Sequence, residues 1–209
     1  GGLGEALASQ LSAAGAALLL TGRNADKLAA IPLAAGAECV RLQADLATPE
    51  GIAATAAAAH RFGANMLINN AGVMAPPRRL SRQGFELQFA VNHLGHFALT
   101  QALLPLLQAR AGARVVHVSS GAHYFGRIAF DDLQGERRYD AWAAYAQSKL
   151  ANVMTALELQ QQLEASGSAV LSVAAHPGLA RTNLQPTSVA ARGSRLEALA
   201  CRLMDPLFQ

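Results

Sequence analysis

Short apolar runs alternate with longer amphipathic segments along the chain, and this alternation predicts the secondary structure. Brief runs rich in Val, Leu, Ile and Ala are typical of buried strands, whereas apolar residues three or four apart are typical of helices. The predicted strands are residues 17–21, 39–43, 66–68, 114–119 and 169–175. The predicted helices are residues 4–14, 25–35 with an interruption at Pro32, 49–62, 81–109 and 141–166. Strands alternating with helices form a parallel sheet covered on both faces. The pattern therefore predicts a doubly wound α/β fold, in which ligands bind at the carboxyl ends of the strands.

Composition and charge narrow the class of protein. The chain has 209 residues, of which 52% are hydrophobic, enough for one core and a single domain, residues 1–209. The formal net charge is only +3 and the basic residues are scattered, so we expect no nucleic-acid partner. Cys39 and Cys201 are too few for a disulfide framework, which favours a reducing, cytoplasmic location. No apolar run approaches the roughly 18 residues of a membrane span. A signal or anchor would precede Gly1, so membrane association stays undetermined.

Tyr145 and Lys149 form the most informative pair in the sequence. They stand four residues apart in a predicted helix, so both side chains leave the same face. A phenol has an unperturbed pKa near ~10, and a nearby ammonium lowers it, which suits a tyrosine that exchanges protons with a substrate oxygen. The alternatives are a half-buried structural tyrosine and a solvated helix charge. This spacing occurs by chance in many helices, so its weight comes from the motifs around it.

A set of motifs in a fixed order surrounds this pair. They are Gly2-Leu3-Gly4, Asp45-Leu46, Asn69-Asn70-Ala71-Gly72, residues 91–97 (VNHLGHF), Val118-Ser119-Ser120 and His176-Pro177-Gly178. Together with Tyr145 and Lys149, the set resembles the short-chain dehydrogenase/reductase family over nearly the whole chain. Residues 122–126, 130–134 and 148–153 are most similar to the retinol dehydrogenase-like group of that family. The resemblance implies a Rossmann-type doubly wound sheet and an NAD(P)-dependent oxidoreductase, and it leaves homo-oligomer formation open.

The resemblance assigns four catalytic residues. Tyr145 would be the general acid in carbonyl reduction or the base in alcohol oxidation, and Lys149 would lower its pKa and bind the nicotinamide ribose. Ser120 would hold the substrate oxygen through a hydroxyl that can donate and accept, and it is favoured over Ser119. Asn92 matches an asparagine that anchors a water-mediated proton relay. The alternative for Asn92 is an amide that finds its partners in the core.

The resemblance also assigns a cofactor site. Gly2, Leu3 and Gly4 match the end of a glycine-rich turn at which a helix N-terminus receives the pyrophosphate. Arg23 suits the 2′-phosphate of NADP, so NADP is favoured over NAD; the alternative is ordinary surface charge. The other expected cofactor contacts are Asp45 and Leu46 at the adenine, Asn70, Ala71 and Gly72 beside its ribose, Pro177, Gly178 and Thr182 over the nicotinamide, and Tyr145 with Lys149.

Histidines and apolar residues near the predicted site bear on metal and substrate. His93 and His96 lie three residues apart, but no Cys, Asp or Glu accompanies them at ligand spacing, so no metal site is expected. The expected walls of the substrate pocket are Val73, Met74, His123, Tyr124, Phe125, Leu179 and Leu184. These residues are largely apolar, which favours a small lipophilic carbonyl or alcohol, such as a retinoid, a steroid or an aromatic aldehyde or ketone.

The chain departs from the family pattern at both ends. It opens inside the glycine-rich turn, without the first strand that lies at the centre of the family's sheet, and it stops before the expected last strand. We therefore expect an incomplete domain with unpaired backbone groups, low stability and at best weak activity. The leading function is an NADP-dependent oxidoreductase; the alternative is a non-catalytic NAD(P)-sensing or scaffold protein on the same fold. The joint presence of Asn92, Ser120, Tyr145 and Lys149 favours the enzyme.

Overall fold

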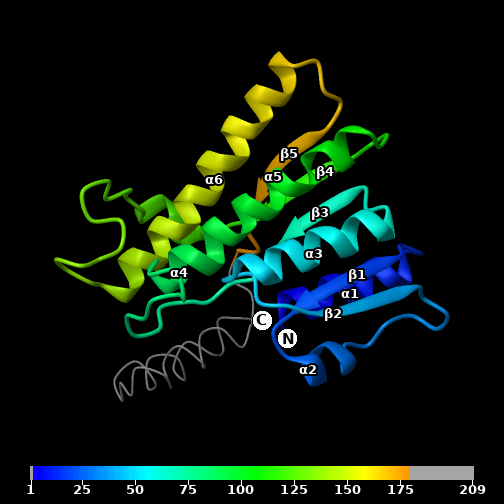
Figure 1. Cartoon of the computed structure of the whole chain (residues 1–209), viewed down its shortest axis with the longest axis horizontal. Coiled ribbons are helices and arrows are strands. Elements are labelled where there is room, and N and C mark those ends of the chain that lie inside the picture. The colour runs from blue at the N-terminus through cyan, green and yellow to red at the C-terminus, as the bar shows by residue number, and fades with distance from the viewer. Residues whose placement is uncertain (1, 179–209) are drawn as a thin grey trace.

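The computed structural model describes residues 2–178 of the chain (Figure 1). The strands are β1 (Leu18–Gly22), β2 (Cys39–Gln43), β3 (Met66–Asn69), β4 (Arg114–Val118) and β5 (Leu171–Ala175). The α-helices are α1 (Leu3–Ala13), α2 (Ala25–Ala29), α3 (Pro49–Phe62), α4 (Leu87–Phe89), α5 (Gly95–Gln108) and α6 (Ala141–Ala165). A π-helical turn, η1 (Ala90–Leu94), joins α4 to α5, and a 3₁₀ segment, η2 (Gly121–Phe125), follows β4.

All strand pairs are parallel, but the described strands form two sheets where the sequence predicts one. β1 pairs with β2, and β3, β4 and β5 form a second sheet in that order. The register places Leu18 opposite Cys39 in the first sheet. In the second sheet Arg114 lies opposite both Met66 and Leu171. Parallel strands joined by helical crossovers confirm the Rossmann-type α/β architecture, with a break in hydrogen bonding between β1 and β3.

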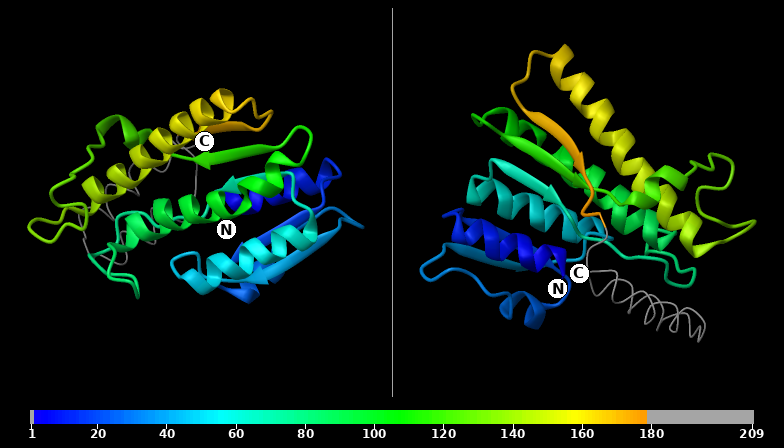
Figure 2. Two further views of the ribbon diagram at one scale, coloured as in Figure 1. Left: turned by 45° about the horizontal axis from the view of Figure 1, so that its top comes forward. Right: turned by 180° about the vertical axis from the view of Figure 1, so that it is seen from behind.

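Helices cover both faces of these sheets. α3, α5 and α6 lie on one face and α1 on the other (Figures 1 and 2). Leu99, Leu103 and Leu107 of α5 pack with Leu163 of α6 and Val115 of β4 in the main core cluster. The four-residue spacing of the α5 leucines places them on one stripe of the helix. Burial of each leucine stabilises the fold by about 1.5–3 kcal/mol, so this cluster holds α5, α6 and β4 together.

The long helix predicted over residues 81–109 begins later, at Leu87. A bridge between Leu80 and Glu86 closes a turn before the helix, and Gly84 takes a φ of 84° in this turn. The Glu86 carboxylate then accepts a hydrogen bond of 2.8 Å from the Phe89 N–H and caps α4. Apolar periodicity could not show this start, because it was set by a glycine turn and a cap rather than by the hydrophobic stripe.

Two further elements differ from the sequence prediction. α2 ends at Ala29 rather than at residue 35, which agrees with the inability of the following Pro32 to continue a helix. The 3₁₀ segment η2 was not predicted, since such short segments have no apolar repeat to reveal them. The other predicted strands and helices match the structure to within two residues at each end.

Candidate active site

The carboxyl ends of β3 and β4 and the start of α6 bring the four predicted catalytic residues into one region. Ser120 lies just after β4, Asn92 lies in η1, and Tyr145 and Lys149 lie in the first turns of α6. Tyr145 is 5% exposed, Lys149 is 4% exposed and Asn92 is fully buried. Polar groups gathered at the strand ends of a doubly wound fold mark the usual position of its ligand site.

Tyr145 is a buried phenol with one polar neighbour. Burial raises its pKa, and the Ser120 side chain, within hydrogen-bonding reach of the phenol, acts in the opposite direction. Trp142 packs edge-on against the ring at 6.1 Å between centroids. The net change is opposite to the lowering predicted from the sequence, because desolvation of the phenolate outweighs the stabilising contact. Tyr145 is therefore protonated at neutral pH, in the form that can donate a proton.

Lys149 lies behind Tyr145 with its ammonium inside the protein. Its Nζ donates to the Val118 carbonyl oxygen at 3.0 Å and lies 5.7 Å from the Tyr145 ring centroid. Burial lowers the pKa of Lys149 to about 8. A charged lysine has three N–H donors, and the Val118 carbonyl accepts from one, so two can serve a further acceptor.

The Asn92 side chain is held by partners on two elements. Its Oδ1 accepts from the Val73 N–H at 2.8 Å, and its Nδ2 donates to the Val73 carbonyl and to the Ser148 hydroxyl, each at 2.9 Å. Both amide donors and the amide oxygen are thus used within the protein. Asn92 therefore ties the loop after β3 to α6, and a proton relay anchored by Asn92 stays a prediction.

The two serines after β4 point to different partners, as strand alternation predicts. The Ser119 hydroxyl donates to the Lys149 carbonyl oxygen at 2.9 Å and is buried. Ser120 instead contacts Tyr145, and its Oγ also accepts from the Ala122 N–H at 3.3 Å. His123 contacts the Ser120 carbonyl oxygen through Nδ1 at 2.6 Å. The His123 ring therefore lies beside the four predicted catalytic residues, Asn92, Ser120, Tyr145 and Lys149, which we call the tetrad.

The N-terminus of α1 has the features of an anion site. Gly2 caps the helix with a φ of 60° and, as a glycine, supplies no side-chain cap to the N–H groups of the first turn. Unpaired N–H groups at a helix start attract a phosphate. At Gly4, a Cβ would come within 2.8 Å of the Asn70 side-chain nitrogen, so a larger residue there would require the Asn70 side chain to shift. The structure thus brings the predicted glycines and Asn70 together, and these residues fit a dinucleotide.

Gly72 performs a similar role beside the tetrad. A Cβ on Gly72 would meet the Asn92 Oδ1 at 3.2 Å and the Lys149 Nζ at 3.7 Å. The absence of a side chain therefore leaves the loop after β3 close to the Lys149 ammonium. Ala71 and Gly72 lie in this loop, directly after Asn70.

The remaining predicted cofactor residues follow β1, β2 and β5. Arg23 is exposed directly after β1, and its carbonyl oxygen accepts from the Gln43 side chain at 3.1 Å, which fixes the backbone there. The Asp45 carboxylate accepts from the Ala47 N–H at 2.9 Å, so it shapes its own turn. Pro177 and Gly178 lie just beyond β5, Leu46 lies beside Asp45, and Thr182, Leu179 and Leu184 lie outside the described residues.

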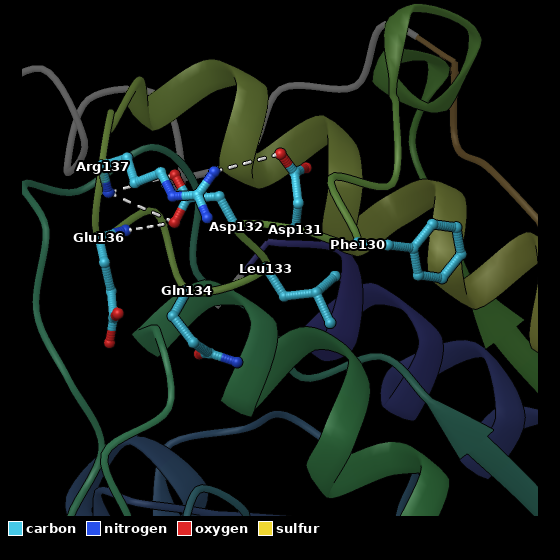
Figure 3. Close-up of a pocket in the computed structure, with 7 residues that line it drawn as sticks. All are labelled: Phe130, Asp131, Asp132, Leu133, Gln134, Glu136 and Arg137. Atoms are coloured by element: carbon cyan, nitrogen blue, oxygen red, sulfur yellow. Dashed lines mark hydrogen bonds and ion pairs between the residues drawn. The ribbon is translucent and has the colours of Figure 1, made fainter.

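The motif at residues 130–134 forms a surface hollow with Glu136 and Arg137 (Figure 3). The Asp132 carboxylate accepts from the backbone N–H groups of Glu136, at 2.7 Å, and Arg137. Arg137 also pairs with Asp131 at 3.5 Å. None of the four tetrad residues lines this hollow. Residues 130–134, which resemble the retinol dehydrogenase-like group, therefore form a loop that is held by its own hydrogen bonds.

Sequence reasoning missed a buried polar group beside the tetrad. Gln88 is fully buried and Glu86 is 2% exposed, and both contact the Tyr139 hydroxyl, at 3.0 and 3.1 Å. Burial, and then the Glu86 charge, raise the pKa of Tyr139 to about 12. The available signal was polar residues inside an apolar helical pattern, with Gln88 one helical turn before Asn92.

Within residues 2–178, no helix is long and apolar enough to cross a membrane. In the same described part of the chain, no three His, Cys, Asp or Glu side chains are grouped so that they could hold a metal ion.

Comparisons with known proteins agree with this geometry. The sequence model of the short chain dehydrogenase family matches residues 1–193. Human retinol dehydrogenase 12 is 48% identical over 145 residues, which are 69% of this chain and 43% of that protein, so the chain spans less than half of that relative's length. A crystal structure of an uncharacterized protein from Mycobacterium paratuberculosis is 42% identical, with a TM-score of 0.80 over 91% of this chain and 72% of that one. A metagenomic short-chain oxidoreductase in complex with NADP is 26% identical, with a TM-score of 0.67 over 92% of this chain and 85% of that one. The chain belongs to the short chain dehydrogenase family.

Proposed function

We propose that this protein is an NADP-dependent oxidoreductase that interconverts a carbonyl and an alcohol, with Tyr145 as the general acid and base. The observation that carries the proposal is the meeting of Tyr145, Ser120 and Lys149 at the carboxyl ends of the strands, with Gly72 close to the Lys149 ammonium. Family membership and the relatives named above support the same reaction class.

Each side chain has a role that its environment suits. Tyr145 is protonated because burial raises its pKa, so it can give its proton to the oxygen of a carbonyl undergoing reduction. Ser120 is next to the phenol and can donate a hydrogen bond to the same substrate oxygen. In alcohol oxidation the same pair would act in reverse, with Tyr145 accepting the proton. The Lys149 charge nearby favours the phenolate that forms after proton transfer.

The cofactor would lie along the carboxyl ends of the strands. The N–H groups at the start of α1, with Gly2, Leu3 and Gly4, would hold the pyrophosphate, and the exposed Arg23 would bind a 2′-phosphate. Lys149 has donors for the nicotinamide ribose, and Asp45, Leu46 and residues 70–72 would line the adenosine half. When bound, the nicotinamide supplies or accepts the hydride. Arg23 supports NADP over NAD.

The substrate is proposed to be a small lipophilic carbonyl or alcohol. Tyr124 and Phe125 follow Ser120 closely and are 74% and 89% exposed, so apolar surface is offered beside the tetrad. The rings of His123 and Tyr124 pack in a tilted arrangement, with their centroids 4.0 Å apart. The name of the human relative, a retinol dehydrogenase, supports an alcohol of this kind. A cytoplasmic location and a homo-oligomeric state stay predictions.

A fluorescence titration with NADPH, with NADH in parallel, tests the cofactor half of the proposal. Saturable binding that favours NADPH supports it, and equal or weaker NADPH binding contradicts the NADP preference. A panel of lipophilic aldehydes and ketones, with Tyr145→Phe as the blank, then tests turnover. Binding of NADPH without turnover of any carbonyl or alcohol would favour the nucleotide-sensing alternative.

A further inference from the structure

Two buried amides, Gln88 and Asn92, stand one helical turn apart on the segment that runs through α4 and η1. Both side chains are fully buried. Residues four apart on a helix share a face, so both amides point to the same side of this segment. Asn92 bonds Val73 in the loop after β3 and Ser148 in α6.

Gln88 makes the same kind of connection one turn earlier. Its Oε1 accepts from the Ala75 N–H at 2.8 Å, in the loop after β3. Its Nε2 donates to the Ala141 carbonyl oxygen at 2.9 Å, at the first residue of α6, and to the Tyr139 hydroxyl at 3.0 Å. Both amide donors and the oxygen are used, so the side chain has one orientation that satisfies all three partners.

The backbone that Gln88 holds is strained. Ala75 is fully buried and has a φ of 46°, the one positive φ at a non-glycine residue in the described part of the chain. This conformation costs an alanine roughly 1–2 kcal/mol, so surrounding contacts must maintain it. The hydrogen bond from Ala75 to Gln88 is such a contact.

The Tyr139 hydroxyl and the Glu86 carboxylate continue the hydrogen bonding of the Gln88 amide. The Tyr139 hydroxyl, which accepts from Gln88, lies 3.1 Å from the Glu86 Oε1 and can donate to it. The other Glu86 oxygen accepts from the Phe89 N–H at 2.8 Å and starts α4. Buried hydrogen bonds to a charged group are stronger than neutral ones, which fixes the Tyr139 hydroxyl in place.

We propose that Gln88 is a positioning residue for catalysis. Together with Asn92 it sets the spacing between the loop after β3 and the start of α6, and thereby the place of the Tyr145 hydroxyl, one turn into that helix. The proposal rests on the proposed role of Tyr145. Gln88 touches no reacting atom; it acts through Ala75 and Ala141.

Gln88→Met tests the proposal, because methionine has a similar length and no hydrogen-bonding amide. We expect kcat for carbonyl reduction to fall about tenfold or more, since small misplacements of a catalytic group are costly, while the KM for NADPH changes less than about threefold. Thr55→Val is the matched control: it deletes a buried hydroxyl that bonds Gly51 within α3, a helix that carries none of the tetrad residues. The control should lose stability and keep kcat.

A kcat for Gln88→Met within about twofold of the wild-type value would overturn the proposal. It would also be overturned if Gln88→Met and Thr55→Val raised KM and lowered kcat to the same extent. If Gln88→Met fails to fold, Tyr139→Phe carries the test, because it removes one partner of Gln88 and leaves the amide in place. A fall in kcat of about threefold or more supports the proposal, and an unchanged kcat overturns it.

Backbone hydrogen exchange separates this proposal from the proposed function, because it needs no turnover. In Gln88→Met the Ala75 amide should exchange faster, while the Val73 amide, held by Asn92, keeps its rate. An unchanged Ala75 rate would show that Gln88 does not hold the loop. If the wild type turns over no substrate but the Ala75 result is as expected, the proposed function fails and the loop-holding role of Gln88 stands.

Discussion

The buried charge of Lys149 gives a prediction that can be measured without any substrate. Burial lowers its pKa from 10.5 to about 8, so the folded protein disfavours the ammonium that the unfolded chain carries freely. Between those two pH values the unfolded chain binds more protons than the folded one. Stability must therefore rise as the pH rises from about 8 to 10.5, and the full penalty is present below pH 8.

The magnitude follows from the two pKa values. A pKa lowered from 10.5 to about 8 corresponds to about 3 kcal/mol, at about 1.4 kcal/mol per pKa unit. Lys149→Met removes the charge and keeps most of the chain length. The quantity to follow is the difference between the free energy of unfolding of Lys149→Met and that of the wild type, both measured with urea. This difference should decrease by about 3 kcal/mol between pH 7 and pH 10.5. Other groups that titrate in this range are common to both proteins and cancel.

Lys27→Met is the matched control, because Lys27 is exposed on α2. The change with pH in the difference from the wild type should be clearly larger for Lys149→Met than for Lys27→Met. A change for Lys149→Met no larger than that for Lys27→Met would refute the reasoning, since it would show that the Lys149 ammonium is as well solvated in the folded chain as in the unfolded one.

Three further substitutions test other parts of the structure. Tyr145→Phe should lower turnover by about a hundredfold or more and leave the NADPH Kd unchanged, measured by steady-state kinetics and fluorescence titration; residual activity close to that of the wild type would exclude Tyr145 as the acid. Arg23→Ala should weaken NADPH binding about tenfold and spare NADH, because it removes a charged hydrogen bond to the 2′-phosphate; equal effects on both cofactors would contradict that contact. Gly95→Ala should lower the free energy of unfolding by about 1–3 kcal/mol despite the better helix propensity of alanine, because its Cβ would collide with the Leu46 carbonyl; an unchanged urea midpoint would contradict the close approach.

Much of the fold was predictable because it depends on local pattern. The bounds predicted for β2 and α3 agree with the structure, since a short apolar run and a proline at the first helical turn are local signals. The start of α4 was wrong by six residues, because a glycine turn and the Glu86 cap override the apolar repeat there. The apolar pattern alone could not show the break between the two sheets, since strand pairing depends on segments far apart in the sequence; the family resemblance, in contrast, predicted a sheet without its central strand.

The site shows the same division between local and long-range information. The spacing of Tyr145 and Lys149 places both side chains on one helix face, and that much is fixed by helical geometry. The direction of the Tyr145 pKa change was wrong, because it depends on burial beneath neighbouring elements rather than on the distance to Lys149 along the chain. Gln88 was missed for a related reason: its partners Ala75 and Ala141 lie 13 and 53 positions away.

The sequence by itself determined the alternation of strands and helices, the parallel α/β class and the ordered motifs at the strand ends. These follow from periodicities and spacings that any chain expresses locally. Only the tertiary structure decided which polar groups are buried, which partners satisfy them and how burial alters their acidity. Those properties depend on contacts between residues distant in sequence, such as the bonds from Gln88 and Asn92 to the loop after β3 and to α6.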